Sequence, residues 1–453
     1  MFVDMARTLD RVGARGILGK PTRVVAFRSL SIRFRDLADV ESPFARREGA
    51  TRQANVLSNF ARTKMKYPRS PTSRHNPPRD LSPPFVVASF PIHHPMGDEA
   101  PVGLITERAY ARIGLFGNPS DGYFGKTISV SIQNFFSEVV LVPDQQCFSS
   151  RISFEPGPYD WNAFESLSTL ARHTKEHGHY GGVRLLRALC VNFHTYCESR
   201  NLNLHEQGFT LRYSTNIPKQ TGLSGSSSII VAGLRCLMKH YDINIPLQEQ
   251  PQLVLKCETD LGINAGLQDR VIQVYEGAVA MDFSDEETVT KTGAGKYEPL
   301  PVYKIPELML VWGDKGNDSS ITHADVKKRW EAGDEFIRST MRKVAAVAEK
   351  AKSVLLSETA TQTECVETLA SLMNENFDLR REMFGDAALG QRNIEMIETP
   401  RLYGAASKFT GSGGAVVVLC PDGDEQLQKV KTMCEQKGFK TQMVVLNPAT
   451  SAA

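Results

Sequence analysis

The chain has 453 residues, of which 41% are hydrophobic and 23% are charged, and its formal net charge at pH 7 is +2. This length exceeds what one hydrophobic core usually serves, so we expect two domains. No apolar run approaches about eighteen residues, which excludes an ordinary membrane-spanning helix. The eight cysteines are scattered without a Cys-x-x-Cys pair, which favours free thiols in a reducing compartment, such as the cytoplasm, over disulfides or a zinc site.

The first part of the chain is a basic extension. Residues 1–80 hold 17 Lys and Arg against 7 Asp and Glu, whereas the remaining residues hold 36 against 44. Because this part is also rich in Pro, Ser and Arg, we expect residues 1–105 to be disordered. The Arg-rich start is compatible with an organelle transit peptide, although Asp4 and Asp10 argue against one, and a species-specific tail is the alternative. Few aromatic residues lie between the arginines, so nucleic acid is not an expected partner.

A folded pattern begins at Tyr110. Apolar or alternating segments predict three strands, at residues 111–116, 127–132 and 138–142. The polar loop 117–125 joins the first two strands and contains Asp121 and Tyr123. By itself, this loop is also compatible with a simple turn between two strands.

The next motif is a loop rich in glycine and serine. It follows the alternating segment 209–215, which predicts a strand, and precedes the apolar segment 229–241, which predicts a helix. The glycines allow backbone conformations and close approaches that a Cβ would prevent. The serines lie where a helix presents unpaired N–H groups and the positive end of its dipole, which predicts a phosphate site, unless they only cap the helix. The residues of this site are Gly222, Leu223, Ser224, Gly225, Ser226, Ser227 and Ser228.

Two acidic residues follow the loop. Glu258 lies on a helix predicted at 251–260, and Asp269 follows 11 residues later. Phosphoryl transfer needs a divalent metal ion at the phosphates, a cradle of donors, and a group that accepts the proton of the attacking hydroxyl. Ser226 or Ser227, together with Glu258, could hold Mg²⁺ through oxygen ligands, and Asp269 could accept the proton. Taken alone, Glu258 is also compatible with a solvated helix residue and Asp269 with a helix cap.

The remainder of the chain alternates helices and strands. Between residues 291 and 301 the composition turns to Gly, Lys and Pro, which is typical of a joint between domains. Helices are predicted at 183–198, 326–356, 363–377, 390–398 and 425–437. Strands are predicted at 307–312, 415–419 and 441–446.

Three segments carry a recognisable pattern when they are taken together. The first, 112–127, contains Gly-Asn-Pro-Ser-Asp-Gly-Tyr; the second, 218–228, contains Gly-Leu-Ser-Gly-Ser-Ser; and the third, 408–417, contains Thr-Gly-Ser-Gly-Gly. In this order they resemble the three motifs of the GHMP small-molecule kinases. With the segment 265–275 included, the detailed sequence is most similar to the plant-type glucuronokinases, over about residues 107–447.

The resemblance implies an α+β, two-domain GHMP kinase fold. The expected domains are a ribosomal-S5-like, ATP-binding N-terminal domain at 106–298 and a ferredoxin-like C-terminal domain at 299–453. The implied activity is an ATP-dependent sugar-acid 1-kinase that converts D-glucuronate and ATP to D-glucuronate 1-phosphate and ADP, and so feeds UDP-glucuronate synthesis. The alternatives are another sugar 1-kinase, acting on galacturonate, arabinose or a hexose, and a catalytically silent sugar or nucleotide sensor.

The resemblance also implies roles for single residues. Asp269 would be the proton acceptor, and Glu258 would hold magnesium with Ser226 or Ser227. The sugar contacts would be Asp121, Tyr123, Arg112 and Gly413. A uronate carries a carboxylate, which calls for a cation, and Arg112, Lys126 and Arg270 are equal candidates.

The first motif departs from the family pattern at two places. Arg112 stands where mevalonate kinase-like members have Lys, and Asn118-Pro119 stands where galactokinases have Glu-His. The roles of those family residues therefore do not transfer to this chain.

Overall fold

The computed structural model describes residues 103–145, 150–158, 160–161, 163–177, 181–263, 266–313 and 319–449, with the backbone alone for 175–177 and 319–324. The expected N-terminal extension lies outside the described residues, apart from its last three positions. None of the described helices combines the length and the apolar character needed to cross a membrane. The seven cysteines within the described ranges are free thiols.

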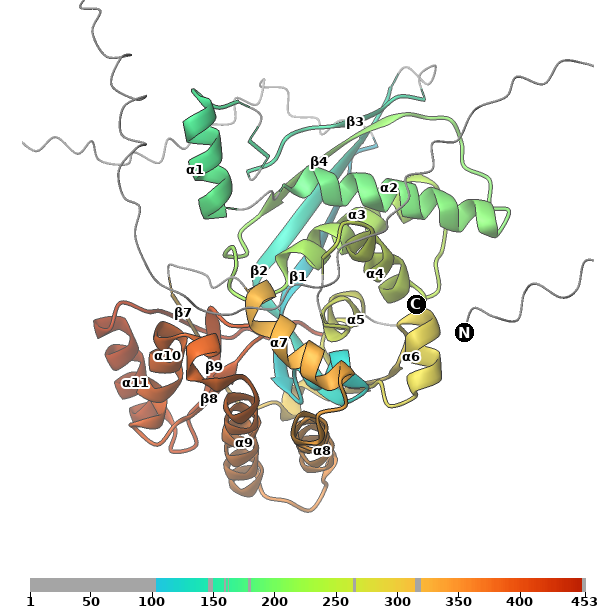
Figure 1. The fold of residues 1–453 in the computed structure, drawn as a ribbon. Coiled ribbons are helices and arrows are strands. Elements are labelled where there is room, and N and C mark those ends of the chain that lie inside the picture. Colours follow the sequence, from blue (N-terminus) through green and yellow to red (C-terminus); the bar gives the residue numbers. More distant parts are fainter. Residues whose placement is uncertain are drawn as a thin grey trace, which may run out of the picture. The chain divides into compact units, whose positions relative to one another are not determined.

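The first half of the described chain is built on a six-stranded sheet (Figure 1). Its strands are β1 (Ile105–Phe116), β2 (Lys126–Pro143), β3 (Ile152–Phe154), β4 (Phe209–Thr215), β5 (Ala278–Asp282) and β6 (Lys296–Leu300). β1 pairs with one edge of β2, and the other edge pairs with β5 near its start and with β4 near its end. All these pairings are antiparallel except that of β3 with β4.

β2 is a single strand, so the prediction of two strands at 127–132 and 138–142 was wrong. The intervening Gln-Asn-Phe-Phe-Ser contains no Gly or Pro to form a turn. Instead the pairing with β1 shifts register between Tyr110 and Ala111, which face Phe136 and Ile132. Such an irregularity bends a strand without ending it.

Helices accompany this sheet, and α3 and α5 pack directly against it. They are α1 (Leu167–His177), α2 (Gly182–Ser199), α3 (Gly225–His240), α4 (Gln250–Asp260), α5 (Gln268–Tyr275) and α6 (Glu286–Thr292). α3 packs on β1 and β2 and is itself covered by α2 and α4, with Leu186, Leu189 and Ile230 in the shared core. α2 confirms the helix predicted at 183–198. α3 begins four residues before its predicted start at 229, because the serines of the loop form its first turn.

The second half forms a four-stranded antiparallel sheet in the order β10-β7-β9-β8. The strands are β7 (Met309–Trp312), β8 (Ala406–Phe409), β9 (Ala415–Leu419) and β10 (Lys440–Met443). The helices are α7 (Ser319–Glu331), α8 (Glu335–Leu356), α9 (Gln362–Leu389), α10 (Gln391–Arg401) and α11 (Asp424–Gln436). Helices lie between β7 and β8 and between β9 and β10, which is the ferredoxin-like arrangement and confirms that expectation.

The long helix predicted at 326–356 is two helices. α7 ends at Glu331, and α8 begins after Asp334, whose side chain accepts hydrogen bonds from the N–H groups of Phe336 and Ile337. Asp is a favoured N-cap residue, and Gly333 adopts a left-handed conformation with φ of 82°. The short Gly-Asp sequence was therefore the signal for the break.

The two halves share one hydrophobic core. Ile113 of β1 packs in the same cluster as Val344 of α8, Phe377 of α9 and Phe409 of β8. The backbone N–H of Gly114 donates to the carbonyl of Thr410 at 2.8 Å. This packing brings the first motif against the third. The expected domain border at 298/299 falls inside β6, which belongs to the first sheet.

A substitution at Gly117 tests this packing. Its φ is +81°, and an added Cβ would lie 2.1 Å from the Lys126 carbonyl oxygen and 2.8 Å from Cβ of Ala348. We expect Gly117→Ala to lower the free energy of unfolding, measured by urea denaturation, by at least about 2 kcal/mol. Gly122→Ala, in the same loop with open space around the new Cβ, is the matched control and should change it by less than about 0.5 kcal/mol. Equal effects of the two variants would contradict the packing described.

Candidate active site

Two serines of the glycine loop contact a buried carboxylate. Glu258 Oε1 accepts hydrogen bonds from Ser226 Oγ at 3.0 Å and from Ser227 Oγ at 2.6 Å. Its other oxygen, Oε2, accepts from Arg270 Nη2 at 2.5 Å. Glu258 is completely buried and Arg270 is 1% exposed. The helix α4 thus presents Glu258 to the first turn of α3, and α5 supplies the charge that balances it.

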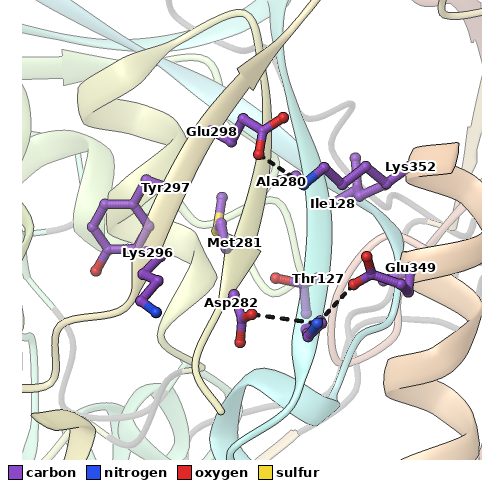
Figure 2. A pocket seen from close by; sticks show the side chains of 12 residues that line it. Thr127, Ile128, Ala280, Met281, Asp282, Lys296, Tyr297, Glu298, Glu349 and Lys352 are labelled. Atoms are coloured by element: carbon purple, nitrogen blue, oxygen red, sulfur yellow. Dashed lines mark hydrogen bonds and ion pairs between the residues drawn. The ribbon is translucent and has the colours of Figure 1, made fainter. Parts of the chain in front are cut away.

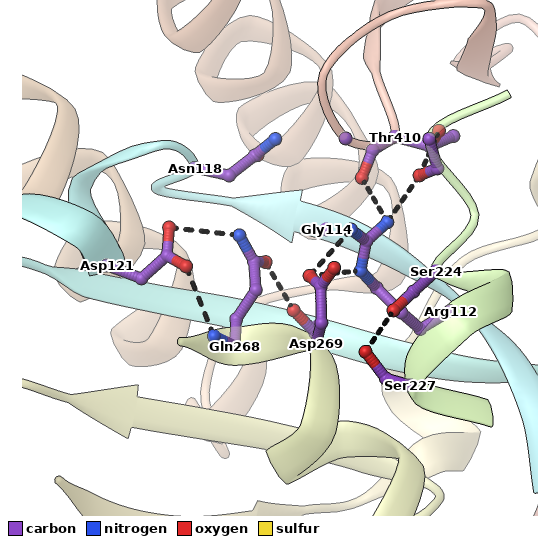
Figure 3. A network of polar contacts seen from close by, with 12 residues as sticks. Arg112, Gly114, Asn118, Asp121, Ser224, Ser227, Gln268, Asp269 and Thr410 are labelled. Atoms are coloured by element: carbon purple, nitrogen blue, oxygen red, sulfur yellow. Dashed lines mark hydrogen bonds and ion pairs between the residues drawn. The ribbon is translucent and has the colours of Figure 1, made fainter. Parts of the chain in front are cut away.

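The second carboxylate, Asp269, is held by Arg112 (Figure 3). The Nε and Nη2 atoms of Arg112 donate to Asp269 Oδ1 at 2.8 and 2.6 Å. Nη1 donates to the carbonyl of Gly222 at 2.5 Å and to that of Thr410 at 3.1 Å. One guanidinium group on β1 therefore fixes Asp269 beside two glycine loops. They are the loop of the second motif, 222–228, and that of the third motif, 411–414, here called the second and third glycine loops. Arg112 reaches only Oδ1, which leaves Oδ2 to accept a further hydrogen bond.

Asp121 lies next to this pair on a short 3-10 helix, Ser120–Tyr123. It is 1% exposed, and it accepts hydrogen bonds from the backbone N–H and the Nε2 of Gln268 at 3.1 and 3.0 Å. Burial raises the pKa of Asp121, and the Gln268 backbone N–H opposes that change. Gln268 in turn accepts from Ser129 Oγ, so the side chain is fixed in one orientation.

Tyr123 is also largely buried. Its ring makes an edge contact with Trp330 of α7, with the centroids 5.2 Å apart. Burial, followed by the nearby charge of Asp121, raises the pKa of Tyr123 to about 12. The hydroxyl therefore stays protonated at neutral pH and can donate a hydrogen bond.

The second and third glycine loops touch. A Cβ on Gly222 would lie 2.8 Å from the carbonyl oxygen of Gly413, so this contact requires glycine. Two buried basic side chains flank the third loop. Arg380 donates to the carbonyls of Gly411 and Ser412, and Lys408 donates to Gly114 O, Asn118 Oδ1 and Phe409 O.

The remaining residues of the predicted phosphate site differ in where their polar groups point. Leu223 is buried, and Ser224 begins the helix in a left-handed conformation with φ of 66°. Gly225 starts α3, where the first backbone N–H groups have no partner within the helix. The hydroxyl of Ser228 contacts Ser137 Oγ at 2.6 Å and donates to the Gly225 carbonyl, so its hydrogen bonds are made inside the protein.

Lys126 lies apart from these contacts. It pairs with Glu349 at 2.7 Å and with Asp282 at 3.3 Å, in a surface pocket between β2, β5, β6 and α8 (Figure 2). The hydrogen bond to Glu349 is the main cause that raises the pKa of Lys126. None of the other predicted site residues lines this pocket. The structure therefore does not bring Lys126 together with Asp269 and the glycine loops.

The serine cluster fits a magnesium ion chemically. Mg²⁺ takes oxygen ligands at about 2.1 Å in an octahedron, which places neighbouring oxygens about 3 Å apart. The hydroxyl oxygens of Ser226 and Ser227 lie 3.0 and 2.6 Å from Glu258 Oε1 as hydrogen-bond donors, so three oxygen atoms are gathered at one place. Within the described ranges no set of three or more His, Cys, Asp or Glu side chains could hold a metal ion, so most ligands would have to come from phosphate and water.

Sequence reasoning missed several residues of this network. Gln268 orients Asp121, and Lys408 and Arg380 lie buried beside the third loop. Lys408 stands at the start of that motif, within a strand whose four residues are all buried, and this position was its only signal. Arg380 lies in the middle of a long helix with many charged residues, where the sequence does not distinguish it from a surface arginine.

Comparison with known proteins gives a consistent set of relatives. The family model of the GHMP kinases N terminal domain matches residues 185–277. Glucuronokinase 1 of Arabidopsis thaliana is 47% identical over 356 residues, which cover 78% of this chain and 95% of that protein. Probable glucuronokinase 2 of the same plant is 47% identical over 350 residues, or 76% and 92% of the two chains. The structure of Lactococcus lactis galactokinase complexed with galactose matches with a TM-score of 0.57 at 16% identity, covering 77% and 95%.

The buried pair of Glu258 and Arg270 gives a stability prediction. Arg270→Met removes the guanidinium and leaves Glu258 buried without its charge partner, which should cost about 3–5 kcal/mol in the free energy of unfolding in urea. Arg381→Met removes an arginine from exposed pairs with Asp386 and Glu398, and it should cost less than about 1 kcal/mol. A loss below about 1 kcal/mol in Arg270→Met would contradict the burial of the ion pair.

Proposed function

The chain belongs to the GHMP kinases, in the group that contains the Arabidopsis glucuronokinases, and we propose that it transfers the γ-phosphoryl group of ATP to the anomeric hydroxyl of D-glucuronate. The products are D-glucuronate 1-phosphate and ADP. Identity of 47% across 95% of a glucuronokinase supports the reaction and the substrate. One geometric observation carries the proposal: Glu258 contacts the serines of the glycine loop, and Arg112, which holds Asp269, donates to Gly222 of the same loop.

Asp269 accepts the proton of the attacking hydroxyl. Its Oδ1 is held by Arg112, and Oδ2, which Arg112 does not contact, is the oxygen that would take the proton. The carboxylate also orients the hydroxyl toward the γ-phosphorus, since positioning supplies much of the rate in phosphoryl transfer. Asp121, Tyr123 and Gly413 hold the sugar on the side of the first and third motifs.

The first turn of α3 holds the phosphates of ATP. Its unpaired N–H groups and the positive end of the helix dipole favour an anion there. Ser226, Ser227 and Glu258 would hold Mg²⁺ at the same turn, and the bound ion would supply positive charge at the phosphate oxygens. Arg270 fixes the Glu258 carboxylate in place.

Another sugar 1-kinase of this family is the nearest alternative. A release assay for ADP with D-glucuronate, D-galacturonate, L-arabinose and D-galactose separates the possibilities, because discrimination between substrates is measured as a ratio of kcat/KM. We expect D-glucuronate to give the highest kcat/KM. A higher value with any of the other sugars would overturn the substrate assignment, and no ADP release with any sugar would favour a non-catalytic sensor.

Asp269→Asn tests the proton acceptor. The amide keeps the shape of the side chain but cannot take the proton, so kcat should fall at least about a hundredfold while ATP affinity changes little. ATP binding is measured by calorimetry and turnover by ADP release. Asp260→Asn, on an exposed carboxylate of α4, is the control and should keep wild-type turnover. A variant within about tenfold of wild type would remove Asp269 from the mechanism.

Ser227→Ala tests the metal site. Loss of one oxygen ligand should raise the Mg²⁺ concentration needed for half-maximal activity by about tenfold or more. Ser228→Ala is the matched control, because the hydroxyl of Ser228 is hydrogen-bonded to Ser137 inside the protein. The measurement is a titration of ADP release with Mg²⁺ at saturating ATP and sugar. The same Mg²⁺ requirement in both variants would exclude Ser227 as a ligand.

A further inference from the structure

A cation that recognises the substrate carboxylate is still needed, and the three candidates from the sequence are all paired with protein carboxylates. Arg112 binds Asp269, Arg270 binds Glu258, and Lys126 binds Asp282 and Glu349. Each of these cations already has its charge balanced. A uronate carboxylate would have to compete with an existing ion pair to reach any of them.

Arg380 of α9 differs from these three. It is 2% exposed, and within the described ranges its guanidinium contacts two carbonyl oxygens and no carboxylate: Nη1 donates to Gly411 O at 2.7 Å and Nη2 to Ser412 O at 3.1 Å. Its Nε is buried without a hydrogen-bond partner. Burial lowers the pKa of Arg380 to about 10, so the group still carries its charge at neutral pH. A buried charge that lacks a counter-ion is costly.

The position of Arg380 suits an acceptor sugar bound at Asp269. Arg112, which holds Asp269, donates to the carbonyl of Thr410, and Arg380 donates to the carbonyl of the next residue, Gly411. Electrostatic interactions with Tyr123 and Asp121 oppose the effect of burial on the pKa of Arg380. One turn earlier on α9, Asn376 accepts from the N–H of Gly117 and donates to the carbonyl of Asn118. α9 therefore contacts the first-motif loop as well as the third glycine loop.

The shape of the Arg380 environment favours a planar anion. The guanidinium lies 5.2 Å from the ring centroids of both Phe384 and Phe409. A guanidinium at this distance is attracted to the ring faces, which helps to fix its position. Its spare N–H groups match the two oxygens of a carboxylate, which an arginine can bind through parallel hydrogen bonds.

Lys408 is the other buried cation near the third loop, and its contacts argue against the same role. Its Nζ lies 2.6 Å from Gly114 O, 2.5 Å from Asn118 Oδ1 and 2.8 Å from Phe409 O. These three oxygens leave the amino group no spare donor. Burial, with the charges of Arg380 and Arg112, also lowers the pKa of Lys408 well below its usual value.

We propose that Arg380 binds the carboxylate of the sugar acid and so sets the preference of the enzyme for uronates over neutral sugars. The inference rests on the proposed function. It assigns to α9 of the second half of the chain the recognition of the substrate carboxylate, while Asp269 acts at the anomeric hydroxyl.

The test compares two substrates that differ only at this group, D-glucuronate and D-glucuronamide. The ratio of their kcat/KM values does not depend on the fraction of enzyme that is folded, so a variant of low stability still gives an answer. In wild type we expect the ratio to favour glucuronate by at least about thirtyfold, the size of a charge-assisted contact. In Arg380→Gln it should fall to within about threefold of one. Arg380→Lys keeps the charge but loses the fork, and it should give an intermediate ratio.

Two control variants make the outcome specific. Arg381→Gln changes the neighbouring arginine, which pairs with Asp386 and Glu398 at the surface, and it should keep the wild-type ratio. An unchanged ratio in Arg380→Gln and Arg380→Lys, with both substrates slowed equally, would mean that Arg380 only supports the glycine loop and would overturn the inference. A ratio that collapses in Lys408→Met but not at Arg380 would also overturn it. Wild type that phosphorylates neutral sugars and not glucuronate would overturn the proposed function, and the inference with it.

Discussion

One guanidinium group joins the three motifs of this protein. Arg112 lies on β1, and two of its nitrogens donate hydrogen bonds to Asp269 of α5. Its third nitrogen donates to the carbonyls of Gly222 and Thr410. These four residues belong to segments up to 298 positions apart in the sequence. If Arg112 were lost, Asp269 would keep its place on α5 but would have nothing to fix its carboxylate beside the loops. The geometry of the site therefore depends on a buried ion pair whose guanidinium also binds the backbone of two loops.

The two carboxylates of the site are each matched with an arginine, but to different effect. Glu258 is fully buried and bonded on both oxygens, by the two serines and by Arg270, so it is a rigid part of the helix junction. Asp269 is 7% exposed, and Arg112 reaches one oxygen only. Ligand chemistry suits the first arrangement and proton transfer suits the second.

Much of this could be predicted from the sequence, where local rules apply. The alternation in β4, the amphipathic pattern of α2 and the order of the three motifs gave the fold class and the position of the phosphate loop. Local rules failed where contacts between distant segments determine the structure. The continuity of β2 depends on its pairing with β1, β4 and β5 along both edges, which no local pattern shows. The partners of Arg112 and Arg270 could not be told apart either, because which arginine meets which acid is decided by how α4 and α5 pack.

The claim that Arg112 acts by holding Asp269 can be tested most directly with a double-mutant cycle on kcat/KM, using Arg112→Met, Asp269→Asn and the double variant. If the guanidinium works through that carboxylate, the double variant should be slowed by no more than about threefold beyond Asp269→Asn alone. Independent effects, in which the losses of the two single variants multiply, would show that Arg112 serves another purpose and would contradict the account of the site given above.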